Sequence, residues 1–343
     1  MSILAIVGAS GVCGKEAITI LNEQTDIHID KLYLFASHRS SGEEVKFRGN
    51  YVTIEEYTSD EAFIGIDFVI LFTPTQVSRD IVGKCKKNSS SPVIIDNSSA
   101  FRMDPTVPLV IPGITDILKY CNSRVISNPN CSTIILLHGL YHLIKNTANK
   151  IKSVDVTTFQ AVSGAGKVGL DELKNQIELY PAQSPFEKFG RQILCNVIPH
   201  ESDIDPVNGY NQEEIKIVQE TSKILDIPNF PVDVECSRAG IERCHLEVVK
   251  VMFETPYDPT KIVLEELIKK AWSNLSGVKV VSSLSDKTKF ADPIMAASTN
   301  DVYISRIRFC HNDSRCLKFR LVGDQLRVGA ALNAIKIFKA LNV

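Results

Sequence analysis

Length, composition and charge exclude several classes of protein. The chain has 343 residues, 44% of them hydrophobic and 23% charged, which is enough for two packed domains with separate cores. The formal net charge of −2, without a cluster of Lys and Arg among aromatic residues, argues against nucleic acid as a partner. No apolar run approaches the roughly 20 residues of a membrane span, and the start of the chain lacks a basic leader. We therefore expect a cytoplasmic protein that acts on a small molecule and has no membrane partner.

The first 130 residues predict alternating strands and helices. Short apolar runs, typical of strands buried on both faces of a parallel sheet, are separated by helical or loop-like sequence. The runs cover residues 3–7, 32–35, 68–72, 93–96 and 124–126, and a first helix covers residues 15–22. This order predicts a doubly wound α/β domain whose ligand binds at the carboxyl ends of the strands.

A glycine-rich turn follows the first predicted strand. Gly8, Gly11 and Gly14 let the backbone approach a pyrophosphate, and the next helix offers free N–H groups to the anion. The spacing is GxxGxxG rather than the GxGxxG of the standard dinucleotide fingerprint. Because glycine turns between strand and helix also occur for packing reasons, the turn alone favours dinucleotide binding only weakly.

The loop after the second predicted strand bears on the choice of cofactor. An NAD-binding fold carries an acid there for the ribose hydroxyls, whereas this chain has Ser37, Arg39 and Ser40. A guanidinium and hydroxyls suit a 2′-phosphate, so the loop favours NADP over NAD. An ordinary polar loop is the alternative interpretation.

Cys131 is the candidate nucleophile. It follows the Asn128-Pro129-Asn130 turn and precedes an apolar, helix-like run, so it stands at a predicted helix N-terminus, where the helix dipole favours the thiolate. An inert buried cysteine is the alternative, since cysteine is among the most buried residue types. The nine cysteines are an odd number without CxxC pairs, which predicts reduced thiols.

From about residue 151 the pattern changes. Strand-forming runs at residues 153–160, 247–254 and 302–309, with helices at residues 212–225 and 259–273, predict an α+β domain with a mainly antiparallel sheet. A free face of such a sheet predicts a homodimer, with a tetramer as the alternative. The segment 328–341 carries an apolar stripe at helical spacing.

A second polar segment precedes one of these strands. His245 stands at the edge of the strand, seven positions after Arg238. Cys236 and Cys244 nearby could suggest a metal, but they lack paired spacing and a fourth ligand, so we expect no zinc. His200 lies in a neighbouring stretch, and we expect it to be an ordinary loop residue.

Taken together, eight segments resemble the aspartate-semialdehyde dehydrogenase family, in that family's order and over nearly the whole chain. The resemblance implies NADPH-dependent reduction of L-aspartyl 4-phosphate to aspartate 4-semialdehyde with release of phosphate, a step towards lysine, threonine, methionine and diaminopimelate. It also implies an NADP-binding domain of residues 1–130 completed by a helix at 327–343, and a catalytic and dimerisation domain at 131–326. The segments are residues 8–14, 37–42, 97–102, 128–133, 159–166, 213–216, 238–245 and 323–333.

The resemblance also implies roles for individual residues. Cys131 corresponds to the nucleophile that accepts the acyl group, His245 to the acid/base and Gln160 to the residue that orients the acyl intermediate. The substrate-binding positions are Arg102 and Lys216 for phosphate, Arg238 for the α-carboxylate, Glu213 for the amine, and Asn130. The cofactor-binding positions are Gly8, Ser10, Gly11, Val12, Gly14, Ser37, Arg39, Ser40, Thr73, Asn97, Ser163, Gly164 and Asn333.

Other functions share parts of this pattern. The segment 72–77 departs from the small, glycine-rich turn of the family, so the contacts of Thr73 to a cofactor stay open. N-acetyl-glutamyl-phosphate reductase and short-chain acyl-CoA reductases share the turn and the cysteine chemistry, but the former has a Gly-Cys-Tyr-Pro context in place of Asn130-Cys131-Ser132-Thr133. A redox-sensing nucleotide-binding protein would use Cys131 alone and would not require Arg102, Lys216, Arg238 and His245 together.

Overall fold

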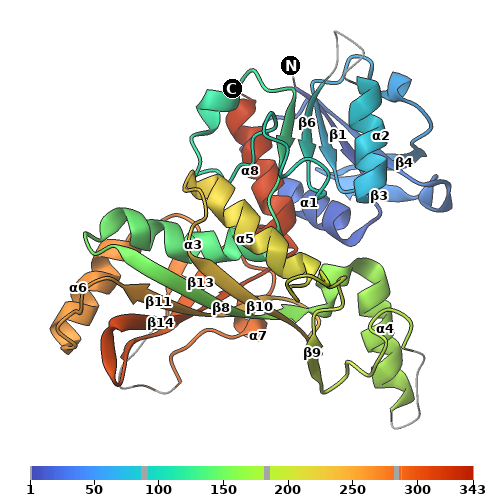
Figure 1. Ribbon diagram of the computed structural model, residues 1–343. Coiled ribbons are helices and arrows are strands. Elements are labelled where there is room, and N and C mark those ends of the chain that lie inside the picture. The colour runs from blue at the N-terminus through green and yellow to red at the C-terminus, as the bar shows by residue number, and fades with distance from the viewer. Residues whose placement is uncertain (1, 86–91, 181–185, 282–285, 287, 343) are drawn as a thin grey trace. The chain divides into compact units, whose positions relative to one another are not determined.

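The computed structural model describes residues 2–85, 92–180, 186–281, 286 and 288–342. It divides into two compact units (Figure 1). The terminal unit holds residues 1–130 and 330–343, and the central unit holds residues 131–329. Each unit is described by itself below.

The terminal unit contains a seven-stranded sheet in the order β3-β4-β2-β1-β5-β6-β7. All neighbours pair in parallel except β3 and β4, which form an antiparallel hairpin. The predicted doubly wound class is thus confirmed. The strands are β1 (Ile3–Val7), β2 (Lys31–Ala36), β3 (Glu44–Phe47), β4 (Asn50–Glu56), β5 (Phe68–Leu71), β6 (Val93–Asp96) and β7 (Val125–Ser127).

Successive side chains of β1 point to opposite faces of this sheet, and each face is covered by helices. Ala5 and Val7 belong to one buried cluster with the apolar side of α2 (Thr75–Cys85). Leu4 and Ile6 point to the opposite face because successive strand residues alternate. Phe68 pairs with Leu4 in the ladder and meets Phe338 of α8 (Leu332–Leu341) edge to face at 5.1 Å. The last helix, which also contacts α1 (Val12–Glu23), therefore covers the second face.

The central unit contains a second seven-stranded sheet, in the order β12-β13-β14-β11-β8-β10-β9. The β8–β10 and β12–β13 pairs are parallel and the other four pairs are antiparallel, so the predicted mainly antiparallel sheet is confirmed. The strands are β8 (Ile151–Ala161), β9 (Val197–Pro199), β10 (Val232–Ala239), β11 (His245–Phe253), β12 (Val278–Val280), β13 (Val302–Cys310) and β14 (Asp313–Gly323).

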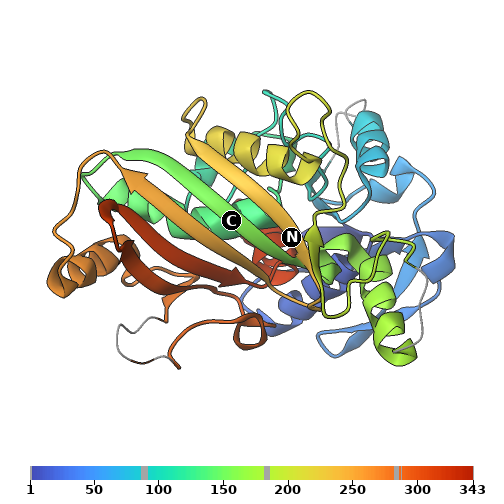
Figure 2. The ribbon, with the colours of Figure 1, turned by 60° about the horizontal axis from the view of Figure 1, so that its bottom comes forward.

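Helices cover one face of the central sheet. α3 (Cys131–Asn146) and α5 (Gln212–Leu225) lie along it (Figure 1), and Figure 2 looks onto the opposite face. In β11 the buried residues alternate with partly exposed ones, as expected for a sheet with one covered face. The remaining helices are α4 (Gly166–Leu179), α6 (Lys261–Trp272) and α7 (Pro293–Ala296).

The structure corrects two expectations about this unit. Cys310 and Cys316 face each other across the β13–β14 hairpin, with their Cα atoms 5.3 Å apart, and are joined as a disulfide. The expectation of reduced thiols is therefore wrong for this pair, because a hairpin brings together two cysteines whose spacing resembles no paired motif. The helix predicted at residues 328–341 begins as α8 only at Leu332, after a π-helical turn at Arg327–Ala331.

No helix in the described part of the chain combines the length and the apolar character that crossing a membrane requires.

Candidate active site

Cys131 is the first residue of α3 and is partly exposed. Its Sγ lies 3.3 Å from Nε2 of His245, which is 114 positions away in sequence and belongs to the same unit. A Cβ added at Gly329 would approach the Cys131 Cβ to 2.7 Å, so the backbone of Gly329 packs directly against the cysteine. A thiol at a helix N-terminus beside an imidazole has the surroundings of a reactive cysteine.

His245 begins β11 and is completely buried. The backbone N–H of Ala161 donates to its Nδ1 at 3.0 Å. Burial, reinforced by Arg238 and opposed by Glu213, lowers the pKa of the imidazole to about 3. The ring is therefore neutral at physiological pH. Since a peptide N–H can only donate, Nδ1 must hold the lone pair, and the single ring proton lies on Nε2, towards the sulfur of Cys131.

The register of the central sheet brings further polar side chains to the same region. Gln160 pairs with Arg238 across β8 and β10, while Phe159 pairs with Leu246, which follows His245. The side chain of Gln160 is buried, and its Nε2 lies 3.4 Å from Glu213 Oε1. Three strand ends thus deliver an amide, a guanidinium and an imidazole to one place.

Glu213 and Lys216 come from the first turn of α5. The helix starts at Gln212 because Asn211 and Glu214 form a reciprocal capping box. Lys216 Nζ lies 3.4 Å from Glu213 Oε2. Glu213 therefore contacts both Gln160 and Lys216, and the carboxylate benefits from the positive end of the helix dipole.

Gly164 explains how the loop after β8 fits over the site. A Cβ at this position would lie 3.0 Å from Arg238 Nη1 and 3.3 Å from His245 Cε1. The hydroxyl of Ser163 donates to the carbonyl of Glu242 at 2.5 Å and accepts from Gln325. In this structure Ser163 thus anchors the loop to the protein, and its cofactor contact stays a prediction.

In the terminal unit, the glycine turn forms a tight cradle at the carboxyl end of β1. A Cβ at Gly8 would meet the Phe72 carbonyl oxygen at 2.3 Å, and one at Gly14 would meet the Gly8 oxygen at 2.2 Å. Gly8 also has a φ of +85°, which favours glycine. Gly11 caps α1 without a side-chain hydrogen bond, so a small backbone surface faces whatever the helix N-terminus binds. The cradle fits a dinucleotide pyrophosphate, and Ser10 and Val12 lie within it.

Ser37, Arg39 and Ser40 follow β2 directly and lie at the same edge of the sheet as the glycine turn. Arg39 is exposed. Glu56 ends the adjacent strand β4 and brings a carboxylate close to this loop, which the sequence analysis did not anticipate. Its Oε2 lies 3.0 Å from His38 Nδ1. The guanidinium is thus available to an anion, while the carboxylate already contacts a histidine.

Asn97, Asn128 and Asn333 form a chain of amides in the terminal unit. Asn128 Nδ2 donates to Asn97 Oδ1 at 2.5 Å, and Asn333 Nδ2 donates to Asn128 Oδ1 at 2.6 Å. Arg102 is buried beside them and donates to the Asn128 and Asn97 carbonyls at 2.9 and 2.8 Å.

Two other predicted ligand residues also have defined surroundings. Thr73 Oγ1 lies 2.8 Å from Ser78 Oγ, and Asn130 is buried. These contacts fix the positions of the predicted ligand residues without testing their roles.

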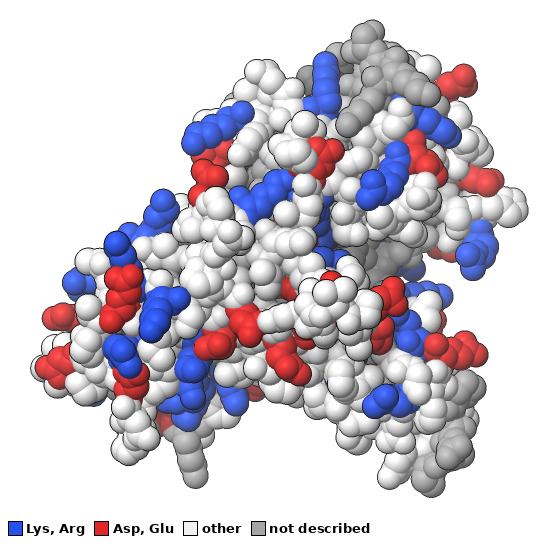
Figure 3. All heavy atoms as spheres, in the orientation of Figure 1, with Lys and Arg blue, Asp and Glu red and all other residues white. Residues whose placement is uncertain are grey.

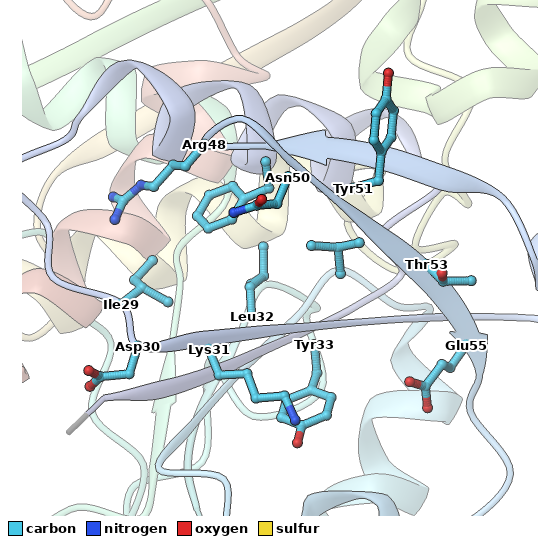
Figure 4. Close-up of a pocket in the computed structure, with 12 residues that line it drawn as sticks. Ile29, Asp30, Lys31, Leu32, Tyr33, Arg48, Asn50, Tyr51, Thr53 and Glu55 are labelled. Atoms are coloured by element: carbon cyan, nitrogen blue, oxygen red, sulfur yellow. The ribbon is translucent and has the colours of Figure 1, made fainter.

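Two surface features bear on the choice of site. On the face in Figure 3, acidic and basic side chains are interspersed within each unit. A cavity of about 570 Å³ lies between β2 and the β3–β4 hairpin (Figure 4). Its lining runs from Asp30 and Lys31 at the amino end of β2 to Glu55 on β4, and it includes no residue of the glycine turn. Among the described residues, no group of three or more His, Cys, Asp or Glu side chains could hold a metal ion.

Comparisons with known proteins define the class. Residues 3–117 match the family model described as semialdehyde dehydrogenase, NAD binding domain, and residues 140–328 match semialdehyde dehydrogenase, dimerisation domain. Together with the fold, these matches define a two-domain oxidoreductase with an NAD(P)-binding domain.

Individual relatives narrow the class to a family. The chain is 38% identical to the aspartate-semialdehyde dehydrogenase of Campylobacter jejuni, over 97% of this chain and 95% of that protein. It is 34% identical to that of Aquifex aeolicus, over 98% and 97%. The crystal structure of aspartate semialdehyde dehydrogenase II from Vibrio cholerae matches with a TM-score of 0.85 and 31% identity, over 99% of this chain and 98% of that one. The chain belongs to the aspartate-semialdehyde dehydrogenase family, as the sequence predicts.

Several groups that the structure brings to the site were not singled out as site residues in the sequence. His200 was expected to be an ordinary loop residue, but it follows β9 directly and accepts a hydrogen bond from Arg238 Nη2 at 2.6 Å. Glu201 pairs with the same guanidinium. The Ala161 N–H that fixes the ring of His245 is a backbone group and carries no sequence signal.

Proposed function

We propose that the chain reduces L-aspartyl 4-phosphate with NADPH to aspartate 4-semialdehyde and phosphate, through a thioester on Cys131. The observation that carries the proposal is the 3.3 Å contact between Cys131 Sγ and His245 Nε2 at the start of α3. The names of the relatives support the substrate, and one matched V. cholerae structure is described as complexed with ASA. The product would enter the synthesis of lysine, threonine, methionine and diaminopimelate.

The first step uses the thiolate. The helix N-terminus and the Nε2–H of His245 both stabilise negative charge on the sulfur of Cys131. The sulfur attacks the acyl carbon, the bond from that carbon to the phosphate oxygen breaks, and phosphate leaves with the electron pair. Lys216 and Arg102 are the proposed ligands of phosphate, as the family resemblance implies. The resulting thioester is more electrophilic than a carboxylate and can accept hydride.

The second step needs a hydrogen-bond donor. When bound at the glycine cradle, NADPH would supply the hydride that reduces the thioester carbonyl. The oxygen of that carbonyl becomes an oxyanion, which the neutral imidazole of His245 can stabilise by donation from Nε2, together with backbone N–H groups at the start of α3. Collapse of the intermediate expels the thiolate and releases the aldehyde. His245 acts here as a neutral donor, because its lowered pKa disfavours an imidazolium.

Three further residues orient the substrate in this proposal. Gln160 would hold the acyl group, since its buried amide lies in the same row as His245 and Arg238. Glu213 would bind the substrate amine, because it is an acidic side chain in the first turn of α5 that contacts Gln160 of the same site. Arg238 would bind the α-carboxylate, for which a planar guanidinium is suited.

NADP rather than NAD is the proposed cofactor. Arg39, Ser37 and Ser40 support it, because they follow β2 where a 2′-phosphate would lie. The glycine cradle, Thr73, Asn97, Ser163, Gly164 and Asn333 are the other proposed contacts. Comparable kcat/KM with NADH and NADPH would overturn this part of the proposal, and Arg39→Ala should raise the KM for NADPH selectively.

A homodimer is the proposed assembly, with a tetramer as the alternative. It is supported by the match to a dimerisation domain at residues 140–328. The sheet face opposite α3 and α5 (Figure 2) is the proposed contact surface. Cytoplasmic location stays a prediction.

The test is turnover in the reverse direction with aspartate semialdehyde, phosphate and NADP⁺. The wild type should reduce NADP⁺, whereas Cys131→Ala and Cys131→Ser should lose at least about 10³-fold in kcat, as for removal of a catalytic nucleophile. Cys195→Ala is the matched control, since Cys195 is an exposed free thiol in the same unit. No turnover by the wild type would contradict the function, and full turnover by Cys131→Ala would contradict the thioester.

A further inference from the structure

Nearly every N–H group of Arg238 already has a partner within the central unit. Nε and Nη2 donate to the two carboxylate oxygens of Glu201, each at 3.0 Å. Nη2 also donates to His200 Nε2 at 2.6 Å, and Nη1 donates to the Ala161 carbonyl at 2.7 Å. One N–H on Nε, two on Nη2 and one on Nη1 make four of the five that a guanidinium carries.

This pattern leaves Arg238 without a free edge for a second carboxylate. A bidentate pair uses two parallel N–H groups from one edge of the guanidinium. The Nε–Nη2 edge is held by Glu201 in the geometry that a substrate carboxylate would use. The Nη1–Nη2 edge is held by a backbone carbonyl and His200. A substrate carboxylate can therefore gain a bidentate contact only if one of these partners leaves.

We propose that Glu201 occupies the carboxylate-binding edge of Arg238 and competes with the substrate for it, so that Glu201 sets the affinity for the acidic substrate. The proposal rests on the role given to Arg238 above. A carboxylate near the binding edge also repels the negatively charged substrate, so both effects raise KM. Once the substrate is bound, Glu201 has left the guanidinium, and the chemical steps at Cys131 are unaffected.

Glu201 can leave without disturbing the sheet. The last backbone hydrogen bond between the β9 segment and β10 is made by its neighbour His200, whose N–H donates to the Cys236 carbonyl at 3.0 Å. Glu201 lies one residue beyond that bond, so rotation of its side chain is sufficient. Its side chain is 11% exposed, against 2% for Arg238, so the carboxylate is the partner nearer to solvent.

A second cation can hold the displaced carboxylate. Lys188 Nζ lies 3.6 Å from Glu201 Oε1, and this lysine is itself 35% exposed. Arg238 lowers the pKa of Glu201 even though burial opposes it, so the carboxylate is ionised at neutral pH. Glu201 therefore keeps Lys188 as a cationic partner when the substrate displaces it from Arg238, which limits the cost of displacement.

The test compares Glu201→Gln with the wild type in the reverse assay, varying aspartate semialdehyde at saturating phosphate and NADP⁺. Removing the competing charge should lower KM roughly tenfold with kcat changed less than about threefold, as for a change in the binding-competent fraction alone. Glu187→Gln, an exposed carboxylate on the same stretch, should leave both constants unchanged. A KM that rises would mean that Glu201 positions Arg238, and an unchanged KM would mean that it does not compete; either result overturns the proposal.

Two additions keep the test independent of folding and of turnover. Glu201→Asp retains the charge but cannot span both N–H groups from the same backbone position, so its KM should lie between the other two, and thermal melting checks that each variant is folded. Calorimetric titration with L-aspartate measures occupancy of the carboxylate site without chemistry, and its Kd should also fall roughly tenfold in Glu201→Gln. Wild-type protein that binds L-aspartate but fails to reduce NADP⁺ would contradict the proposed function alone.

Discussion

Two cysteines of the central unit show how position within an element controls a thiol. Cys131 stands at the N-terminus of α3, is partly exposed, and has the Nε2 of His245 at 3.3 Å. Cys236 lies in the middle of β10, is 1% exposed, and has the carboxylates of Glu213 and Glu214 as neighbours. Burial, together with these carboxylates, raises the pKa of the Cys236 thiol far above its usual range. The first thiol has surroundings that favour the thiolate, and the second has surroundings that forbid it.

The largest effect should come from removing the partner of Cys131. His245→Ala should lower kcat/KM by roughly 10²–10⁴-fold, as for loss of a catalytic hydrogen-bond donor. His245→Gln, which can still donate an N–H to the sulfur, should retain more activity than the alanine variant. Cys195→Ala is the control and should keep near-wild-type kcat, since that thiol is exposed and lies outside the proposed site.

The pH profile of the same enzyme checks the protonation state. With a pKa of about 3, His245 is neutral throughout pH 5–8, so its own titration should not appear in kcat/KM over that range. An inflection near the ordinary histidine pKa of about 6.5 that disappears in His245→Gln would contradict the neutral donor.

Alkylation should reveal the contrast between the two thiols directly. At pH 7 an ordinary thiol is only a few per cent thiolate, so a stabilised thiolate at Cys131 should react with iodoacetamide up to roughly 30-fold faster than the exposed Cys195. Cys236 should stay unmodified until the protein is unfolded. Mass spectrometry of peptides from timed samples measures all three rates, and equal rates at Cys131 and Cys195 would mean that the helix and His245 do not activate the thiol.

The smallest effect concerns the acid beside Cys236. Glu247 is fully buried, and neither of its oxygens has a hydrogen-bond partner among the described residues. Burial raises its pKa well above 4.5, so the folded protein keeps the proton while the unfolded chain loses it. Stability from this group is thus complete below about pH 4.5 and declines as pH rises towards the folded pKa.

Glu247→Gln should remove this penalty. The variant should melt at least about 2 °C above the wild type at pH 8 and within about 1 °C of it at pH 4. Glu254→Gln, an exposed carboxylate at the end of the same strand region, is the control and should shift neither melting temperature. A variant that is less stable at pH 8 would mean that the carboxylate is ionised and stabilised in the folded protein.

The strongly patterned elements could be predicted from the sequence. The strand at residues 3–7 and the helix at residues 212–225 have the observed bounds, because each carries a clear apolar pattern and α5 has its capping residues. The β3–β4 hairpin was missed because its residues are mostly polar and exposed, so neither face gives an apolar alternation. The turn at residues 128–130 indicated that Cys131 lies at or just before a helix N-terminus, and α3 begins at this residue.

Only those features of the site that depend on residue type and local pattern could be predicted from the sequence. A cysteine at a helix start and a histidine at a strand edge could be singled out, but the tautomer of His245 depends on the Ala161 backbone, which has no sequence signature. The pairing of Arg238 with Glu201 joins β10 to the end of β9 across 37 positions. It depends on strand register, which the local pattern around Glu201 does not reveal.

The last helix also affects how the chain must be made. The terminal unit is assembled from residues 1–130 and 330–343, so a ribosome completes it only after the central unit has emerged. At about 5–20 residues per second, synthesis of residues 131–329 occupies roughly 10–40 s. During that time Phe338 of α8 has not yet been synthesised. The sheet face that carries Leu4, Ile6 and Phe68 therefore lacks this contact. Until α8 is made, the terminal unit lacks one of the helices that cover its second face, and apolar surface exposed during synthesis favours aggregation.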